Sequence, residues 1–262
     1  MCGRYALSTD SDGIISELKI ENVSESALSS ELKADWNIAP TKEIYIIKSF
    51  LKNKNTPRSS NDRSEITGSA DERILDTASW GMIAPWSKNY LEANRSQSMA
   101  INARSESVHQ KPTFRNAFRS QRCLIPASGY YEWATELGKY PAKQPVYISS
   151  RSARLLLFAG IYSYWFLPDG SRAIQSASII TRDAVADLAE VHNRMPLFLP
   201  EDQFNRWLDP DTPSQEVEKI IQVSDPDFDL QLWPVSSSVN STKNNGIKLI
   251  RPIELGESQT LF

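Results

Sequence analysis

The sequence of 262 residues has few of the side chains that usually carry redox or metal chemistry. It contains two cysteines, Cys2 and Cys123, and two histidines, His109 and His192. Two cysteines are too few for a disulfide framework, which favours a reducing compartment. The four residues do not have the spacing of zinc ligands, so we expect no metal and no other cofactor.

Long hydrophobic runs are also missing. No stretch of about 18 apolar residues occurs, which excludes a transmembrane helix, and the start MCGRYALSTD lacks the apolar core of a secretory signal. We therefore expect a cytoplasmic protein with no membrane partner, nucleoid-associated if bacterial and nuclear if eukaryotic. Hydrophobic residues make up 40% of the chain and aromatic residues 10%, which is enough for a packed core.

Charge is unevenly distributed along the chain, although the net charge is only −3. Positions 95–122 contain six basic residues and one acid, Glu106, whereas positions 183–229 contain twelve acids and three basic residues. Lys243, Lys248 and Arg251 lie in a stretch, 240–251, that contains no acid. Basic stretches that share one face could follow a phosphate backbone, and the alternative is an ordinary solvated surface.

The hydrophobic pattern predicts a chain rich in strands with a few separated helices. Helices are expected at 10–19, 105–121, 183–189, 201–208 and 214–223, and strands at 44–50, 78–84, 230–236 and repeatedly after 123. This order favours an α+β domain with a mainly antiparallel sheet that closes toward a barrel. Residues 52–75 are polar and are expected to form a mobile surface insertion.

The N-terminus Met1-Cys2-Gly3-Arg4 is the most unusual chemical feature. Aminopeptidases remove Met before a small residue, and the mature chain would then begin with an amine and a thiol on adjacent carbons. The amine titrates near pH 8 and forms an imine with an aldehyde, after which the thiol can close a thiazolidine ring. A terminal nucleophile could equally serve acyl transfer, or Cys2 could simply be a small buried residue.

Such a site needs groups that move protons. Glu132 lies in the aromatic segment GYYEW at 129–133, where burial would raise the pKa of its carboxyl, unless it faces water from an edge strand. His192 lies in a polar segment and could carry protons or be structural. Asn102 could orient a substrate through its amide.

Seven motifs in one order resemble the SRAP (SOS response associated peptidase) family. They are CGRY at 2–5, WNIAPT at 36–41, WGMIAPW at 80–86, INARSE at 101–106, RCLIPA and GYYEW at 122–133, HNRMP at 192–196 and WPVS at 233–236. The resemblance implies a single β-rich, barrel-like domain over 2–253, followed by a tail at 254–262. It also implies a monomer that senses abasic sites in single-stranded DNA and shields them during replication, with replication-fork proteins as further partners.

The family mechanism implies a covalent thiazolidine crosslink formed by Cys2 after removal of Met1. Carried over motif by motif, Cys2 is the nucleophile, Asn102 orients its amine or the sugar, Glu132 is the acid and base for ring opening and for slow reversal of the crosslink, and His192 moves protons at the imine. The resemblance also implies a set of DNA-binding residues: Arg4, Asn37, Pro40, Trp86, Arg104, Trp133, Thr181 and Arg194.

Two other functions remain open. The family name suggests a thiol peptidase or autopeptidase that uses Cys2 with His192 and Glu132, although only Met1 precedes Cys2 here. The chain could also bind single-stranded or modified DNA without a covalent bond. The sequence departs from the usual motifs in that Tyr5 replaces the frequent Phe of the opening motif, and only one tryptophan, Trp86, follows the proline of its motif.

Overall fold

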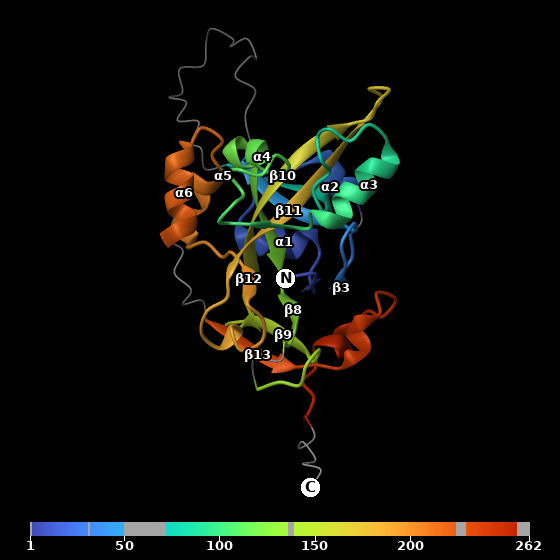
Figure 1. The fold of residues 1–262 in the computed structure, drawn as a ribbon, viewed down its shortest axis with the longest axis vertical. Coiled ribbons are helices and arrows are strands. Elements are labelled where there is room, and N and C mark those ends of the chain that lie inside the picture. Colours follow the sequence, from blue (N-terminus) through green and yellow to red (C-terminus); the bar gives the residue numbers. More distant parts are fainter. Residues whose placement is uncertain (1, 31, 50–71, 136–138, 224–228, 256–262) are drawn as a thin grey trace.

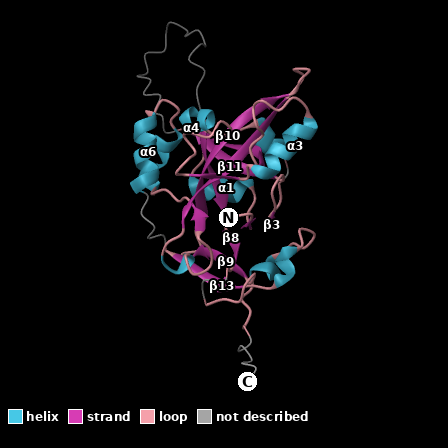
Figure 2. Cartoon of the chain, viewed as in Figure 1, coloured by secondary structure: helices cyan, strands magenta, loops and turns pink. Residues whose placement is uncertain are grey.

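The computed structural model describes residues 2–30, 32–49, 72–135, 139–223 and 229–255. It has two sheets and a few flanking helices, which confirms the predicted α+β class (Figures 1 and 2). Most of the predicted insertion at 52–75, and most of the predicted tail at 254–262, lie outside the described residues. The predicted insertion is too long at its end, because residues 73–75 belong to a strand of the main sheet.

The main sheet closes on itself. Its strands run in the order β12-β11-β10-β7-β4-β5-β2, and a further parallel pairing joins β5 to β11. The closed ring consists of β4 (Glu43–Ser49), β5 (Arg73–Trp80), β7 (Arg122–Ala127), β10 (Leu156–Phe166) and β11 (Ala173–Asp183). The predicted closure toward a barrel is therefore confirmed. Outside the ring, β2 (Asn22–Val23) pairs with β5, while β6 (Asn102–Arg104) and β12 (Arg194–Pro196) pair with β11.

The second sheet has five strands in the order β13-β9-β8-β1-β3 and lies below the barrel in Figure 1. Its strands are β1 (Arg4–Leu7), β3 (Asp35–Ile38), β8 (Gly129–Trp133), β9 (Pro145–Ser150) and β13 (Leu230–Pro234). In the antiparallel pair β1–β8, Arg4 faces Tyr131 and Tyr5 faces Tyr130. This register brings the start of the chain to the end of β8 that carries Glu132.

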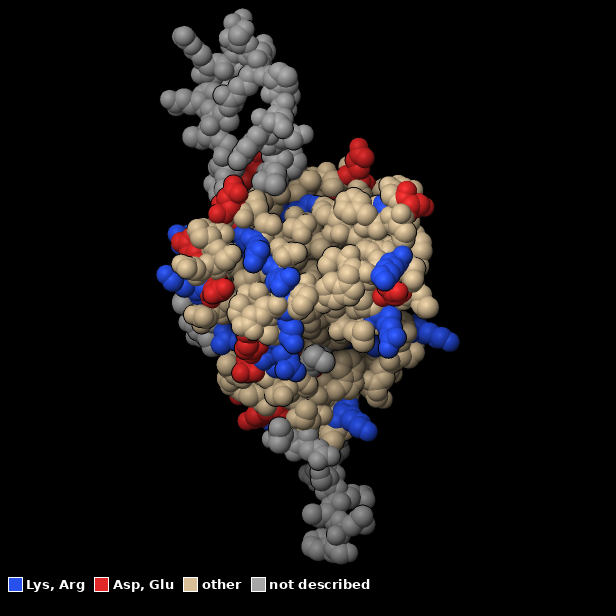
Figure 3. Space-filling model, turned by 45° about the horizontal axis from the view of Figure 1, so that its top comes forward, with Lys and Arg blue, Asp and Glu red and all other residues tan. Residues whose placement is uncertain are grey.

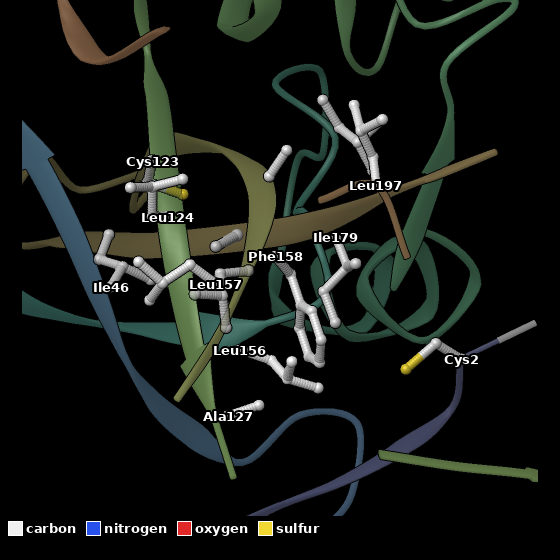
Figure 4. Packing of buried hydrophobic residues seen from close by; sticks show 14 of the residues in the cluster. Cys2, Ile46, Cys123, Leu124, Ala127, Leu156, Leu157, Phe158, Ile179 and Leu197 are labelled. Carbon is white, nitrogen blue, oxygen red and sulfur yellow. The ribbon is translucent and has the colours of Figure 1, made fainter. Parts of the chain in front are cut away.

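Strand alternation separates the side chains of β8 between two clusters, as expected for period 2. Tyr130 packs in the main core with Tyr5 and Phe158, whereas Tyr131 and Trp133 pack in a second cluster. Figure 4 shows Cys2 beside the apolar side chains of the main core. Cys2 and Tyr5 are thus built into the interior of the molecule.

Six α-helices flank the sheets in the described part of the chain. They are α1 (Ser11–Leu18), α2 (Glu25–Ser29), α3 (Tyr90–Met99), α4 (Arg115–Ser120), α5 (Phe204–Leu208) and α6 (Ser214–Val223). Four short 3₁₀ helices are η1 (Ala186–Leu188), η2 (Glu201–Gln203), η3 (Ser237–Asn240) and η4 (Ile247–Ile250). Asp10 caps α1 by accepting from the backbone of Gly13, as the predicted start of that helix requires. No helix of the described residues is both long and apolar enough to cross a membrane.

Several predicted elements differ from the structure. The predicted helix at 183–189 is reduced to the short 3₁₀ helix η1, because β11 continues through Asp183, which pairs with Arg194 of β12. The predicted helix at 105–121 is limited to α4, since the residues before it form successive turns. The predicted strand at 78–84 begins earlier and ends at Trp80, because Gly81 turns the chain with a φ of +109° that favours glycine.

Candidate active site at the N-terminus

Cys2 is fully buried between the two sheets. It lies two positions before β1 of the second sheet, and its carbonyl accepts a hydrogen bond of 2.8 Å from Nδ2 of Asn102. Asn102 belongs to β6, which pairs in parallel with β11 of the barrel. The oxygen Oδ1 of Asn102 is also buried and has no hydrogen-bond partner among the described residues. The amide therefore fixes the Cys2 backbone and keeps one acceptor for another group at the site.

Glu132 is buried to 3% exposure at the end of β8. Burial raises the pKa of this carboxyl to about 7, against the lowering effect of the positive N-terminal amine and a hydrogen bond with it. A carboxyl that is half ionised near neutral pH can both donate and accept a proton. The structure thus places Glu132 in the interior, as predicted, and not on an edge facing water.

The thiol of Cys2 is held in its neutral form. Burial raises the pKa of this thiol well above its usual value, and the nearby charge of Glu132 raises it further. A neutral thiol is a weak nucleophile, so it must lose its proton when sulfur attacks. The electrostatics place the carboxyl of Glu132 within reach of the Cys2 thiol, whereas the terminal amine that acts on Glu132 in this chain belongs to Met1.

His192 lies half-buried in the loop before β12. Its Nδ1 accepts a hydrogen bond of 2.9 Å from the backbone N–H of Arg194, which leaves the proton of the neutral ring on Nε2. Burial lowers the pKa of His192, which favours the neutral ring. The structure therefore links Cys2 to Asn102 by a hydrogen bond and to Glu132 by their electrostatic interaction, and it holds His192 through the backbone of Arg194.

Arg194 and Thr181 were predicted to contact DNA, but in the structure Arg194 is bound by other protein groups and Thr181 is buried. The guanidinium of Arg194 pairs with Glu106 and with Asp183 at 2.5 Å each, and it donates to the carbonyl of Thr181 at 2.7 Å. The side chain of Arg194 is only 9% exposed, and Thr181 is buried. Two protein carboxylates thus occupy the position that a phosphate was expected to take, and the INARSE motif supplies one of them.

Three other predicted DNA-binding residues, Arg4, Asn37 and Trp133, hold a segment at the end of the chain. The buried amide of Asn37 donates to the carbonyls of Val239, Ser241 and Asn244 and accepts from Arg4 at 2.6 Å. Arg4 also donates to the Val239 carbonyl, and Trp133 donates to the side chain of Asn240 at 2.7 Å. We call residues 236–251 the C-terminal segment. Sequence motifs missed its part in the site, since its contacts join residues more than 100 positions apart.

The remaining predicted residues lie on the surface. Trp86 is 56% exposed, Arg104 at the end of β6 is exposed, and Pro40 is half-buried after β3. Lys and Arg side chains lie on both sides of the hollow in the middle of the face drawn in Figure 3. A cavity of about 550 Å³ lies elsewhere, between the end of α1 and the segment before α5, and none of the predicted site residues lines it.

The family model named SOS response associated peptidase (SRAP) matches residues 1–242, and the chain belongs to this family. It is 33% identical over 251 residues to the abasic site processing protein YoqW of Bacillus subtilis, covering 95% of this chain and 99% of that protein. It is 32% identical over 217 residues to the abasic site processing protein HMCES of Gallus gallus, covering 74% of this chain and 62% of that one.

Two solved structures show the same fold. A protein from Bacteroides thetaiotaomicron superposes with a TM-score of 0.77 at 21% identity, covering 97% of this chain and all of that one. A protein from Bordetella bronchiseptica gives a TM-score of 0.67 at 25% identity, covering 90% of this chain and all of that one.

Proposed function

We propose that this protein processes abasic sites in single-stranded DNA by forming a covalent crosslink through Cys2 after Met1 is removed. The observation that carries the proposal is the position of Cys2, buried beside Glu132 and fixed through its carbonyl by Asn102. The names of the relatives support the substrate, since YoqW and HMCES are both called abasic site processing proteins.

The reaction begins with opening of the deoxyribose ring. The protonated carboxyl of Glu132 donates to the ring oxygen while the C1′ hydroxyl loses its proton, which gives an aldehyde. The neutral amine of Cys2 adds to C1′, and the product loses water to form an imine. As nitrogen bonds to C1′, the proton it loses passes to the oxygen that leaves as water, and Nε2–H of His192 donates a hydrogen bond to that departing oxygen, because Nδ1 is engaged by the backbone.

The thiol then completes the ring. Sulfur bonds to the imine carbon, and the thiol proton passes to Glu132, whose carboxylate is within electrostatic reach of Cys2. The imine nitrogen takes up a proton, so the net change is one aldehyde and one aminothiol converted to one thiazolidine and one water. The raised pKa of Glu132, about 7, suits a group that must act first as an acid and then as a base.

The surface residues would hold the DNA around the lesion. Arg104 presents an exposed guanidinium on β6, the strand that also carries Asn102, and Trp86 presents an exposed ring for a base to stack on. Arg194 reaches a phosphate only by exchanging a protein carboxylate for it, because Glu106 and Asp183 hold its guanidinium. We therefore assign Arg194 first to the support of His192, whose ring accepts from its backbone.

The decisive experiment mixes the protein with an oligonucleotide that carries one abasic site, followed by a denaturing gel and intact mass. The wild type is compared with Cys2→Ala, with a form that retains Met1, and with Cys123→Ala as a control for the other buried cysteine. We expect a heat-stable adduct for the wild type and Cys123→Ala only, with its mass lower by one water than the sum of its parts. An adduct in Cys2→Ala would refute the assigned nucleophile.

The two other functions give different results in the same assay. A peptidase would need a thiolate, which burial of Cys2 disfavours, and it would cleave peptides in a manner that depends on Cys2. A non-covalent DNA binder would bind equally well as Cys2→Ala and leave no adduct in any form.

A further inference from the structure

We propose that the C-terminal segment is a second phosphate-binding surface, which holds the DNA on one side of the abasic site only. This inference rests on the proposed function and adds to it the residues Lys243, Lys248 and Arg251. None of these belongs to the motifs that define the family resemblance.

The first support is the charge of the segment. Lys243, Lys248 and Arg251 are all exposed, and positions 240–251 contain no acid. Among the described residues none of the three forms an ion pair, whereas some exposed cations elsewhere do, such as Arg151 with Asp229. Three uncompensated cations on one short segment are complementary to a polyanion.

The second support is the rigidity of the segment. Val239 and Leu249 are buried against Ala6 and Tyr131 of the second sheet. Trp233 donates to the carbonyl of Ile250 at 2.8 Å. The segment is therefore a fixed part of the fold, and its cations are presented without a large cost in ordering on binding.

The third support is its attachment next to Cys2. Arg4, two residues after Cys2, donates to the carbonyl of Val239, and Trp133, the residue after Glu132, donates to Asn240. The segment thus borders the reactive residue from the side of the second sheet. Arg104 borders it from the other side, since β6 extends the barrel sheet and Asn102 on the same strand bonds to Cys2. If the abasic site of a DNA strand lies at Cys2, the nucleotides on one side of it would contact Arg104, and those on the other side would contact the C-terminal segment.

The test uses the variant K243Q/K248Q/R251Q and a matched variant, K19Q/R154Q/K219Q, which removes two lysines and one arginine from positions at the end of α1, in the loop before β10 and on α6. Two oligonucleotides of equal length carry a tetrahydrofuran analogue of the abasic site, which cannot form the aldehyde, near the 5′ end or near the 3′ end. Affinity is measured by fluorescence anisotropy as a function of salt.

We expect the C-terminal variant to lose affinity for one of the two oligonucleotides and to keep it for the other. On the affected one, the slope of log affinity against log salt should fall by about 0.7 for each phosphate that the segment no longer neutralises, or by about 2 for three phosphates. The matched variant should bind both like the wild type. Circular dichroism and the unfolding midpoint show that each variant is folded.

Two results would overturn the inference. Unchanged affinity and slope for both oligonucleotides would show that the three cations do not contact the DNA. An equal loss for both would show that they attract DNA only through their charge and not on one side of the lesion. Either result leaves the proposed function intact if the wild type still forms its adduct with a true abasic site. Absence of that adduct would refute the proposed function itself.

Discussion

Replacing Glu132 with Gln tests whether this carboxyl is kept at the expense of stability. In the folded protein its pKa is raised from 4.5 to about 7 by burial. In the unfolded chain it ionises near its ordinary value, so between about pH 4.5 and about pH 7 the folded state holds one more proton than the unfolded state. The contribution of Glu132 to the free energy of unfolding therefore falls as the pH rises through this window, and the loss is complete above it.

The size of the effect follows from the shift. One pKa unit corresponds to about 1.4 kcal/mol, so the shift of Glu132 costs the folded protein about 3 kcal/mol at alkaline pH. Gln has nearly the same shape and does not ionise. The difference in the free energy of unfolding between Glu132→Gln and the wild type should therefore increase by about 3 kcal/mol, in favour of the variant, as the pH rises from about 4 to about 8.

The assay is urea unfolding of both proteins at a series of pH values. The difference between the two curves removes the titration of groups that both proteins share. A difference that stays constant from about pH 4 to about pH 8 would refute the raised pKa, and a difference that falls with pH would mean that the folded site favours the charged carboxylate.

The same variant should be a slow crosslinker. Loss of a general acid and base costs typically about 10²- to 10⁴-fold in rate, so adduct formation by Glu132→Gln, followed by quenched gel assay, should slow by at least the lower figure. If the variant is both more stable at about pH 8 and slower to react, Glu132 lowers the stability of the folded protein and is retained for its part in the reaction. Unchanged kinetics would remove Glu132 from the mechanism.

Three further changes test other parts of the structure. Arg104→Gln should weaken binding of single-stranded DNA and lower its salt slope by about 0.7; an unchanged slope would place Arg104 away from the phosphates. Asn37→Ala should lower the free energy of unfolding by about 1–3 kcal/mol, because three carbonyls lose their buried donor, and limited proteolysis should cut the C-terminal segment earlier; wild-type resistance would contradict this. Tyr5→Phe should raise stability by about 1 kcal/mol, since the buried hydroxyl of Tyr5 has no hydrogen-bond partner among the described residues; a loss measured by thermal unfolding would reveal an interaction that this hydroxyl makes in solution.

Local signals predicted the fold where local physics determines it. The helix predicted at 10–19 is found as α1, and the amphipathic pattern of 214–223 marks α6. The error at 183–189 has a different origin, because Asp183 continues a strand only through its pairing with Arg194 across a turn. Neither residue carries a strand signal of its own.

The candidate site shows the same division. Glu132 stands out in the sequence as a carboxylate among aromatic residues, and the structure buries it. The surroundings of Arg194 were not predictable, since its partner Glu106 lies 88 positions earlier and the sequence does not indicate which carboxylate reaches it. The hydrogen bonds from Asn37 to the C-terminal segment likewise join residues 202–207 positions apart.

The position of β1 has a mechanical consequence. β1 is an interior strand, with β8 on one side and β3 on the other. Under the proposed chemistry the DNA is joined to the residue two positions before this strand, so a motor enzyme that tugs the DNA would draw β1 along its own length. Both hydrogen-bonded ladders would then bear the load together. Forced unfolding is limited by the unfolding rate, so a motor enzyme would have to unfold the protein before it could pass the adduct.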